Sequence, residues 1–484
     1  MTFLAESTWS GRFYSNGWKA ASETVAIVEP ATGTELERYG APTLKDLDVA
    51  AAHAVEAQRE WEQLPAPEKA AIMRRAGDLF TQYAPTLQNW LSREAGSGQG
   101  KAAYEAGIVA SEFYYAAATA EVPYGQLLRT SKPRLSLSRR RPVGLVGVIS
   151  PFNFPAVLTA RSLAPALALG NAVILKPDPR TTVSGGFVFA EVLEEAGLPA
   201  GLLHVLPGGA EFGSALIEDP RVRVISFTGS TQAGKMIGER AGRLLKRAHL
   251  ELGGNSALVV MDDVDVAAAA SAGAWGSFLH QGQICMTTGR HLVHERIYDE
   301  YVAALAEKAR NLPAGDPMSG APLGPIIDQR QLHKIDDLVT ASVAAGAKLE
   351  AGGTHTGLFY DATVLSEVTP DHPAFSQEVF GPVAPVARFS SIDDLVELAT
   401  ATEYGLSLGI LAKDAFAAFE LSSRIPSGIV HINDQTVDDE AMAPFGGVAA
   451  SGTGARFGGH EANLEAFTET QWITIQGQIE RYPF

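Results

Sequence analysis

Apolar and polar positions divide the middle of the chain into short strands that alternate with helices. Four short apolar runs predict buried strands, at residues 145–150, 171–176, 202–206 and 222–227. Longer stretches with helical spacing predict helices over residues 156–169 and 187–196. Such an alternation predicts an α/β fold with a parallel sheet wound by right-handed crossovers. Ligands in these sheets bind at the carboxyl ends of the strands.

The alternation continues in the second half, whereas helices dominate the opening third. Residues 256–261, 363–368 and 428–432 predict strands, and the alanine-rich run 267–279 predicts a packed helix. Thr43 and Asp46 have the spacing of a capping box, and Pro67 suits the first position of the next helix. A third helix is predicted over residues 101–120, and none of these three helices carries recognisable chemistry.

Two further segments have the pattern of exposed strands. Residues 126–141 alternate around Leu135 and Leu137 and end in three arginines, and the tail 469–476 alternates with polar edges. The arginines most simply protect a sheet edge against unwanted pairing. A basic patch for nucleic acid is the alternative, although the run is short and the protein acidic.

Composition narrows the class of protein and its partners. A chain of 484 residues predicts two or three domains. The net charge of −17 argues against non-specific nucleic-acid binding and against docking on anionic membranes. The N-terminus lacks the features of a signal peptide, and the longest apolar tract, 156–175, is too interrupted to span a membrane. A single cysteine fits a reducing compartment, so we expect a cytoplasmic protein.

Three side chains near predicted strand ends have chemical potential. Asn153 lies between two prolines, and its amide is a neutral donor suited to an oxyanion. Lys176 ends a strand where the ribose or phosphate of a nucleotide would lie. Glu251 precedes two glycines and is placed to serve as a general base. Each residue alone is also explained by a turn or a capped helix.

A fourth strand end, from Gly229 to Met236, approaches the pattern of a phosphate-binding loop. Small residues admit a phosphate to the backbone, and the following helix offers its positive end. The spacing makes an ATP-dependent enzyme an alternative, but Met236 replaces the hydroxyl that would hold magnesium. Binding of a pyrophosphate fits the sequence better. Small residues that merely pack a helix start are the structural alternative.

The chain's only cysteine, Cys285, directly follows the predicted helix 267–279 and a polar Gln-Gly-Gln turn. A lone cysteine leaves no disulfide or cysteine-rich metal site within one subunit. Partial exposure and a lowered pKa would make Cys285 a nucleophile, with backbone N–H groups to stabilise an anion. A buried, inert thiol is the alternative.

Seven short motifs, taken in order, make the chain resemble the NAD(P)-dependent aldehyde dehydrogenase superfamily from about residue 20 to the end. They are Pro151-Phe152-Asn153-Phe154-Pro155, Leu175-Lys176-Pro177, Phe227-Thr228-Gly229-Ser230-Thr231 with Gly234, Glu251-Leu252-Gly253-Gly254-Asn255, Gly282-Gln283-Ile284-Cys285, Glu378-Val379-Phe380-Gly381-Pro382 and Pro444-Phe445-Gly446-Gly447. The string from Lys176 to Thr181 is most similar to that of benzaldehyde and vanillin dehydrogenases. The resemblance therefore implies oxidation of an aromatic aldehyde to its carboxylic acid with NAD or NADP.

The resemblance also assigns roles to residues. Cys285 is the implied nucleophile, Glu251 the general base, and Asn153 the oxyanion donor together with the Cys285 backbone N–H. The reaction would pass through a thiohemiacetal and a thioester on Cys285. The implied cofactor contacts are Ser150, Pro151, Phe152, Lys176, Pro179, Gly209, Gly213, Thr228, Gly229, Ser230, Gly234, Leu252, Gly253, Glu378 and Phe380. The implied substrate contacts are Phe152, Leu158, Arg161, Ile284, Met286 and Phe445, and no metal is expected.

The family fold implies three parts for this chain. A Rossmann-like nucleotide-binding domain would comprise residues 1–124 and 143–253, and an α/β catalytic domain residues 254–452. Residues 125–142 and 453–484 would supply a small oligomerisation sheet that pairs subunits into dimers or tetramers.

Two positions bear on specificity. Pro179 stands where NAD-preferring members commonly carry a glutamate that would repel the extra phosphate of NADP, and Arg180 or Lys176 would attract that phosphate. We therefore expect use of both cofactors. Arg161 resembles the arginine with which dicarboxylic semialdehyde dehydrogenases hold a distal carboxylate, but Leu279 replaces its usual partner arginine.

Three alternatives to an aromatic-aldehyde dehydrogenase therefore remain. A semialdehyde dehydrogenase of the succinic semialdehyde type is the first, although the apolar candidates near the thiol suit a flat ring better. The ATP-dependent enzyme is the second. A non-catalytic structural member of the superfamily is the third, and the joint presence of Cys285, Glu251 and Asn153 counts against it.

Overall fold

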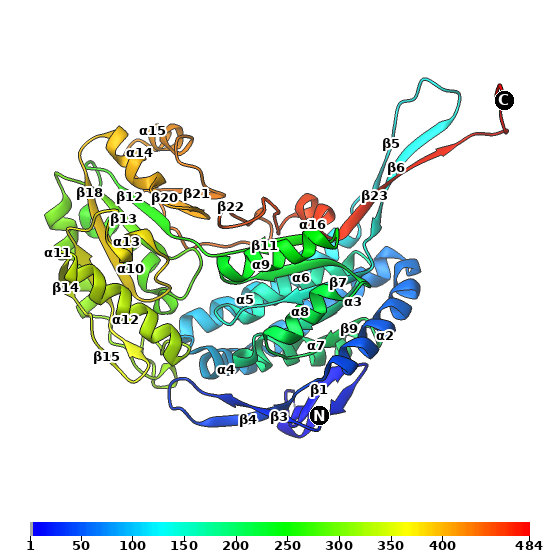
Figure 1. Ribbon diagram of the computed structural model, residues 1–484, viewed down its shortest axis with the longest axis horizontal. Coiled ribbons are helices and arrows are strands. Elements are labelled where there is room, and N and C mark those ends of the chain that lie inside the picture. The colour runs from blue at the N-terminus through cyan, green and yellow to red at the C-terminus, as the bar shows by residue number, and fades with distance from the viewer. Residues whose placement is uncertain (1–2) are drawn as a thin grey trace.

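The computed structural model describes residues 3–484, and their strands form two seven-stranded sheets and several smaller ones (Figure 1). Across the first sheet the strands are β11 (Arg247–Glu251), β10 (Val222–Thr228), β7 (Leu145–Ile149), β8 (Ala172–Lys176), β9 (Leu203–Val205), β1 (Arg12–Ser15) and β2 (Trp18–Ala20). The run from β11 to β9 is parallel, whereas β1 and β2 add an antiparallel edge. The four predicted strands of the middle region are thus confirmed as neighbours in one sheet.

Helices cover both faces of the first sheet. They are α1 (Glu6–Trp9), α2 (Leu44–Gln63), α3 (Ala66–Gln82), α4 (Ala84–Ala95), α5 (Gln99–Ala120), α6 (Pro155–Ala168), α7 (Val188–Ala196), α8 (Ala210–Glu218) and α9 (Thr231–Arg243). From β7 through β8 to β9 the chain adds strands in one direction across the sheet, and it then returns to add β10 and β11 on the other side of β7. Because these crossovers are right-handed, the reversal places α6 and α7 on one face of the sheet and α8 and α9 on the other. On the first face, α5 packs over α6.

Local sequence explains where two of the early helices begin. Thr43 and Asp46 form the predicted capping box at the start of α2, with the Thr43 backbone N–H donating to Asp46 at 2.7 Å. Pro67 lies in the first turn of α3, where its missing N–H costs nothing. The hairpin of β3 (Thr24–Val28) and β4 (Glu35–Gly40), and the pair β1 and β2, were not predicted in this helical region.

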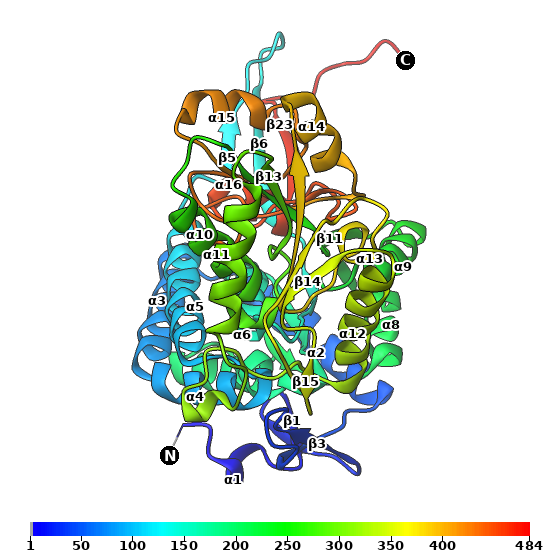
Figure 2. The same ribbon diagram turned by 90° about the vertical axis from the view of Figure 1, so that its left-hand side faces the viewer.

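Helices flank the second sheet in Figure 2, and a cluster of buried side chains lies on each of its faces. Its strands are β14 (Lys348–Ala351), β17 (Thr363–Ser366), β18 (Val383–Phe389), β13 (Thr288–His294), β12 (Ser256–Val260), β20 (Ser407–Leu411) and β21 (Ile429–Ile432). Its helices are α10 (Val266–Phe278), α11 (Tyr298–Arg310), α12 (Gln329–Ala344), α13 (Pro373–Ser376), α14 (Ile392–Thr400) and α15 (Ala415–Ser422). Along β12, Ala257 and Val259 join one cluster while Leu258 and Val260 join the other, as the two-residue period of a strand requires.

A three-stranded sheet projects from the body, with the C-terminus beyond its tip (Figure 1). Its strands are β5 (Gly125–Leu127), β6 (Leu135–Pro142) and β23 (Thr468–Ile475). The single strand predicted over residues 126–141 is wrong, because the chain turns back before Leu135 to form a hairpin. The prediction that its arginines protect a sheet edge is also wrong, because β6 is the central strand. Arg140 instead pairs with Glu465 at 2.8 Å, and Arg141 with Glu62 at 3.0 Å.

The remaining elements are small. Two further antiparallel strand pairs are β15 (His355–Thr356) with β16 (Phe359–Tyr360), and β19 (Tyr404–Gly405) with β22 (Val448–Ala449). The helix α16 (His460–Phe467) packs against α5 and α6 before the chain enters β23. Over residues 3–484, no helix has both the length and the apolar character needed to cross a membrane. In the same range, no group of three or more His, Cys, Asp or Glu side chains is arranged to hold a metal ion.

Candidate active site

The carboxyl ends of β7, β8, β10 and β11 meet at one edge of the first sheet, beside a cavity of about 320 Å3 that we call the edge cavity. The strand register places Ile149 beside both Phe227 and Lys176, and Thr228 beside Glu251. The turns that follow these strands therefore converge, as in other open parallel sheets. The cavity is lined by Ile149, Ser150, Pro151, Phe152, Asn153, Lys176, Asp178, Arg180, Phe227, Thr228, Gly229, Ser230, Ala233, Leu252, Gly253, Cys285, Arg330, Gln331, Lys334, Glu378 and Phe380.

Most of the implied cofactor contacts line this cavity, but Pro179, Gly209, Gly213 and Gly234 do not. Gly234 lies beneath Leu252, where a Cβ would be 2.2 Å from Leu252 Cδ2. A Cβ on Gly213 would lie 3.5 Å from the Lys176 side chain. Gly234 therefore makes room for a lining residue, whereas a Cβ on Gly213 would make only an ordinary contact with Lys176. Pro179 opens a short 3-10 turn capped by Asp178, and Gly209 caps α8.

Four charged or polar lining residues had not been singled out from the sequence. Asp178 lies between Lys176 and Pro179, so its position beside these two predicted contacts was the available signal. Arg330, Gln331 and Lys334 come from α12, one of the helices of the second sheet. No sequence spacing predicts that α12 lies near the strand ends, because the two segments come together only through tertiary packing.

The charge of Arg180 is compensated by carboxylates. Its guanidinium pairs with Asp178 at 2.8 Å and with Asp328, and it stacks over the Phe152 ring at 4.3 Å. Burial alone would raise the pKa of Asp178, but the hydrogen bonds and charge of Arg180 outweigh burial and lower it. Asp178 therefore stays ionised, and Arg180 presents little net charge to a ligand.

Glu378 is held against the glycine pair that follows Glu251. Its Oε1 accepts a hydrogen bond from the Gly254 backbone N–H at 2.9 Å, and a Cβ on Gly253 would lie 2.6 Å from Oε2. Burial raises the pKa of Glu378, while the Gly254 N–H and the charge of Lys334 oppose the rise. Because glycine has no side chain, the Glu378 carboxylate can lie this close to the backbone of Gly253.

Cys285 lies on a loop that hydrogen bonds hold to two distant segments of the chain. His280 and Gln281 adopt left-handed backbone conformations directly after α10, with φ of 51° and 53°. The Gln281 side chain donates to the carbonyls of Gly96 and Pro325, at 3.1 and 3.0 Å. A Cβ on Gly254 would lie 2.3 Å from the Cys285 carbonyl oxygen, so the glycine pair lets the thiol loop lie against the end of β11.

The protein around Cys285 disfavours the thiolate. The residue is partly exposed and lines two cavities, yet its surroundings remove most of the water. Burial, followed by the carboxylates of Glu378 and Glu251, raises the pKa of Cys285 to about 12, and Arg161 only partly offsets this. The surrounding side chains therefore do not supply the lowered pKa that would by itself make Cys285 a nucleophile. A base has to remove the thiol proton.

Glu251 is a buried carboxyl at the end of β11. It is 3% exposed, and among residues 3–484 neither of its oxygens has a hydrogen-bond partner. Burial raises its pKa well above the ordinary value, and the charges of Arg456 and Arg161 oppose this. The Glu251 Oε1 and the Arg456 Cδ lie 2.7 and 2.9 Å from the position of a Cβ on Gly446, so the carboxyl faces this glycine. A carboxyl with a raised pKa is suited to acid–base chemistry near neutral pH.

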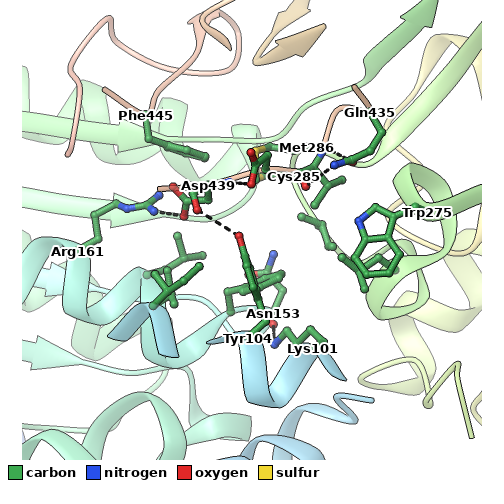
Figure 3. A pocket seen from close by; sticks show the side chains of 18 of the residues that line it. Lys101, Tyr104, Asn153, Arg161, Trp275, Cys285, Met286, Gln435, Asp439 and Phe445 are labelled. Carbon is green, nitrogen blue, oxygen red and sulfur yellow. Dashed lines mark hydrogen bonds and ion pairs between the residues drawn. The ribbon is translucent and has the colours of Figure 1, made fainter. Parts of the chain in front are cut away.

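Cys285 and Asn153 also line a second cavity of about 320 Å3, which we call the aromatic pocket (Figure 3). Its lining comprises Gly100, Lys101, Tyr104, Ile108, Asn153, Phe154, Val157, Leu158, Arg161, Trp275, Leu279, Ile284, Cys285, Met286, Asp434, Gln435, Val437, Asp438, Asp439 and Phe445. Leu158, Arg161, Ile284, Met286 and Phe445 had been proposed from the sequence. Phe152 does not line this pocket and faces the edge cavity instead.

A polar network occupies one side of the aromatic pocket (Figure 3). Arg161 pairs with Asp439 and, at 3.4 Å, with Glu112, and its guanidinium lies 4.5 Å from the Phe445 ring centre. The Tyr104 hydroxyl donates to the Asp439 carbonyl at 3.1 Å. Sequence analysis had not identified Asp439, Glu112 or Tyr104, because they come from α5 and from a loop some 300 residues later.

Comparison with known proteins relates this architecture to enzymes. The aldehyde dehydrogenase family model matches residues 18–473. The chain is 60% identical to a vanillin dehydrogenase of an Amycolatopsis species over all of both chains. It is 46% identical to a benzaldehyde dehydrogenase [NAD(+)] of Pseudomonas putida over 98% of each chain. The crystal structure of a salicylaldehyde dehydrogenase from Pseudomonas putida G7, complexed with salicylaldehyde, superimposes with a TM-score of 0.94 at 35% identity, covering 98% of this chain and 99% of that one.

The family match extends over nearly the whole chain and includes the second sheet, all strands of the first sheet except β1, and both cavities. The chain belongs to the aldehyde dehydrogenase family.

Proposed function

We propose that this protein oxidises aromatic aldehydes to carboxylic acids with NAD or NADP. The observation that carries the proposal is the position of Cys285 and Asn153, which line both the edge cavity and the aromatic pocket. A thiol at such a junction contacts a cofactor on one side and an aldehyde on the other. The names of the vanillin and benzaldehyde dehydrogenase relatives support an aromatic substrate.

The edge cavity fits a dinucleotide. Gly229 and Ser230 lie at the start of α9, whose N-terminus offers backbone donors to a pyrophosphate, and Lys176 lies beside them. Glu378, which lies against the glycine pair near Cys285, would bind the nicotinamide ribose, and Phe380 would pack beside it. When bound, the nicotinamide accepts the hydride that the substrate carbon gives up.

The chain's own residues supply the covalent chemistry. The Cys285 thiolate attacks the aldehyde carbon, while the Asn153 side-chain amide and the Cys285 backbone N–H stabilise the oxyanion. Oxidation leaves an acyl thioester on Cys285. Glu251 takes a proton from water, which attacks the thioester and releases the carboxylate and the free thiol. Because the thiol pKa is raised, an ordered water or another base has to accept the thiol proton before attack, and the role of Glu251 is confined to deacylation.

A semialdehyde substrate fits the aromatic pocket less well. Such a substrate needs an uncompensated cation for its distal carboxylate, but Arg161 is already paired with Asp439 and Glu112. Leu279, at the position of the missing second arginine, adds an apolar side chain to the pocket. Trp275, Met286 and Phe445 offer flat or adaptable surfaces to an aromatic ring.

An ATP-dependent activity would need the lysine of the phosphate-binding pattern to reach the phosphates, and that lysine does not line the edge cavity. In that interpretation Lys235 would reach the phosphates, but its side chain is largely exposed and pairs with Glu403 at 3.1 Å. Met236 is also exposed, so neither side chain belongs to the edge cavity.

We further propose that the enzyme is cytoplasmic and self-associates through the projecting sheet. Several large apolar side chains on or near that sheet are exposed, including Tyr124, Leu127, Trp472 and Ile475. Exposed apolar surface on a projecting sheet favours pairing with another copy.

A two-way screen tests the proposed function. Benzaldehyde, vanillin and succinic semialdehyde are each assayed with NAD and with NADP, following formation of the reduced cofactor. We expect the aromatic aldehydes to have the higher kcat/KM with either cofactor and without ATP. A higher kcat/KM for succinic semialdehyde would contradict the aromatic assignment while leaving the family intact.

A further inference from the structure

A buried ion pair lies directly beneath Asn153. Lys101 and Glu105 face each other one turn apart on α5, with side chains 1% and 0% exposed. Lys101 Nζ donates to the Asn153 carbonyl oxygen at 2.7 Å and to Ser97 Oγ at 3.0 Å (Figure 3). The three donor positions of the ammonium are therefore used by Glu105, Asn153 and Ser97.

Glu105 holds the chain just beyond Asn153. Its Oε1 accepts hydrogen bonds from the backbone N–H groups of Ala156 and Val157, at 2.8 and 3.2 Å. These are orphan donors in the first turn of α6, whose N-cap, Phe154, offers no side-chain acceptor. The pair thus binds both sides of the turn that carries Asn153, the carbonyl before α6 and the amides that begin it.

The same ammonium connects this turn to the thiol loop. Lys101 Nζ lies 4.0 Å from the centre of the Phe154 ring, close enough for a cation–π contact. That ring also approaches His280 edge-on at 5.8 Å, and His280 begins the left-handed turn that leads to Cys285. The turn with Asn153 and the loop with Cys285 are therefore held at one point.

Stability alone does not account for such a pair. Removing two charges from water is costly, and apolar residues of similar size often replace a buried ion pair without loss of stability. A fully bonded buried pair does fix geometry, because every partner has a defined direction. An oxyanion donor requires that kind of precision, since a misplacement of about 1 Å can cost on the order of 10²-fold in rate.

We propose that Lys101 and Glu105 are positioning residues that fix Asn153 relative to Cys285 for oxyanion stabilisation. The proposal rests on the proposed function, because it presumes that Asn153 serves as the oxyanion donor. Neither residue touches the reacting atoms in this account. Their effect reaches the oxyanion through the Asn153 carbonyl and through the first turn of α6.

The test is a double-mutant cycle between the ion pair and Asn153. In Lys101→Met/Glu105→Gln the charges are removed together, so no unpaired charge is left buried, and glutamine keeps an acceptor for the α6 amides. The substitution is made in the wild-type and in the Asn153→Ala background. The readouts are the single-turnover rate of cofactor reduction, KM for the aldehyde and the melting temperature. Glu94→Gln is the matched control, because Glu94 is another buried carboxylate that accepts two backbone N–H groups, from Val183 and Ser184, outside both cavities.

We expect Lys101→Met/Glu105→Gln to lower the single-turnover rate by about 10- to 100-fold, with little change in KM or melting temperature. In the Asn153→Ala background the same change should cost less than about twofold, because its target is gone. Glu94→Gln should leave the rate unchanged.

Two results would overturn the proposal, and they separate it from the proposed function. If Asn153→Ala lowers the rate but Lys101→Met/Glu105→Gln does not, or if the two losses multiply, the ion pair does not act through Asn153. If Asn153→Ala itself leaves the rate unchanged, the proposed oxyanion role fails, and the positioning role fails with it.

Discussion

The edge cavity and the aromatic pocket share Cys285 and Asn153 but are built in different ways. Much of the edge cavity comes from consecutive strand ends of one sheet, between residues 149 and 253, where glycines and backbone amides set its shape. The aromatic pocket collects side chains from α5, α6, α10, the thiol loop and residues 434–445. The edge cavity is lined mainly by residues at and just after the strand ends of one sheet, and the aromatic pocket by side chains from distant segments.

This difference separates two kinds of specificity. Backbone donors at strand ends suit a feature common to many ligands, such as a pyrophosphate. Side chains gathered from distant segments are free to differ without disturbing the sheet, and they set which aldehyde fits. Substitutions in the aromatic pocket should therefore change substrate preference and leave cofactor use intact, whereas substitutions at the shared residues should disturb both halves of the reaction.

The largest effect is expected at the shared thiol. Cys285→Ala should lower kcat by more than about 10³-fold, since loss of a nucleophile normally costs several powers of ten. The edge cavity should still bind reduced cofactor, which fluorescence titration measures. Retention of more than about a thousandth of the wild-type rate would contradict the covalent mechanism.

Glu251→Gln should have the next largest effect, because it removes the base from deacylation and leaves the thiol in place. We expect kcat to fall by about 10²-fold or more, with a burst of reduced cofactor equal to the enzyme concentration. Since only the ionised carboxylate acts as base and its pKa is raised, wild-type kcat should increase with pH above the ordinary glutamate range. That increase should be absent in the variant. A wild-type profile that is flat from about pH 5 to pH 8 would contradict this role.

Asp439→Asn tests whether side chains of the aromatic pocket set substrate preference without affecting cofactor use. Removing one of the two carboxylates that compensate Arg161 should make the pocket more attractive to a carboxylate, and raise kcat/KM for succinic semialdehyde relative to vanillin by about tenfold. KM for the cofactor should not change. The matched control is Asp438→Asn, which removes an equal charge from the same pocket lining. Equal responses of the two variants would show that net charge matters and the pairing with Arg161 does not.

The smallest effect is expected at Arg180. We expect the wild type to use NAD and NADP with kcat/KM values within about 100-fold, or about 2.7 kcal/mol, because Pro179 supplies no repelling carboxylate. Arg180→Gln should alter that ratio by less than about threefold, because Asp178 and Asp328 already compensate the guanidinium. A selective loss of NADP activity in Arg180→Gln would show that the arginine reaches the extra phosphate.

The backbone-defined parts of the molecule were the parts that the sequence predicted well. Strands such as 145–150 and 222–227 are continuous apolar runs, and the order of helices between them determines the edge at which their ends meet. The turn residues after those strands, including Ser150, Thr228 and Gly229, therefore line the edge cavity as expected. Gly234 and Gly213 were harder to assign, because a glycine that packs beneath a lining residue leaves the same sequence signal as one that lines the cavity.

The parts that depend on tertiary contacts were predicted only in part, because five lining residues of the aromatic pocket had been proposed and most had not. The helix 101–120 was expected to carry no chemistry, although Lys101 and Tyr104 line the aromatic pocket. Phe152 was expected near the substrate, but the turn after β7 points it to the other cavity. The raised pKa of Cys285 comes first from burial and then from Glu378, 93 positions later in the chain, and no local sequence pattern reports either. The hairpin at residues 125–142 was missed because alternation alone does not reveal where a chain reverses.

The most direct test of the account is mass spectrometry, before and after proteolytic digestion, of Glu251→Gln that has been mixed with vanillin and NAD and quenched in acid. Hydride leaves the substrate before deacylation, so this variant should accumulate the acyl thioester. We predict an added vanilloyl group on the peptide that contains Cys285, and no such adduct in Glu251→Gln/Cys285→Ala. The central claim is that Cys285, which lines both cavities, is the nucleophile. Formation of reduced cofactor in Glu251→Gln without an adduct, or with the adduct on another residue, would contradict it.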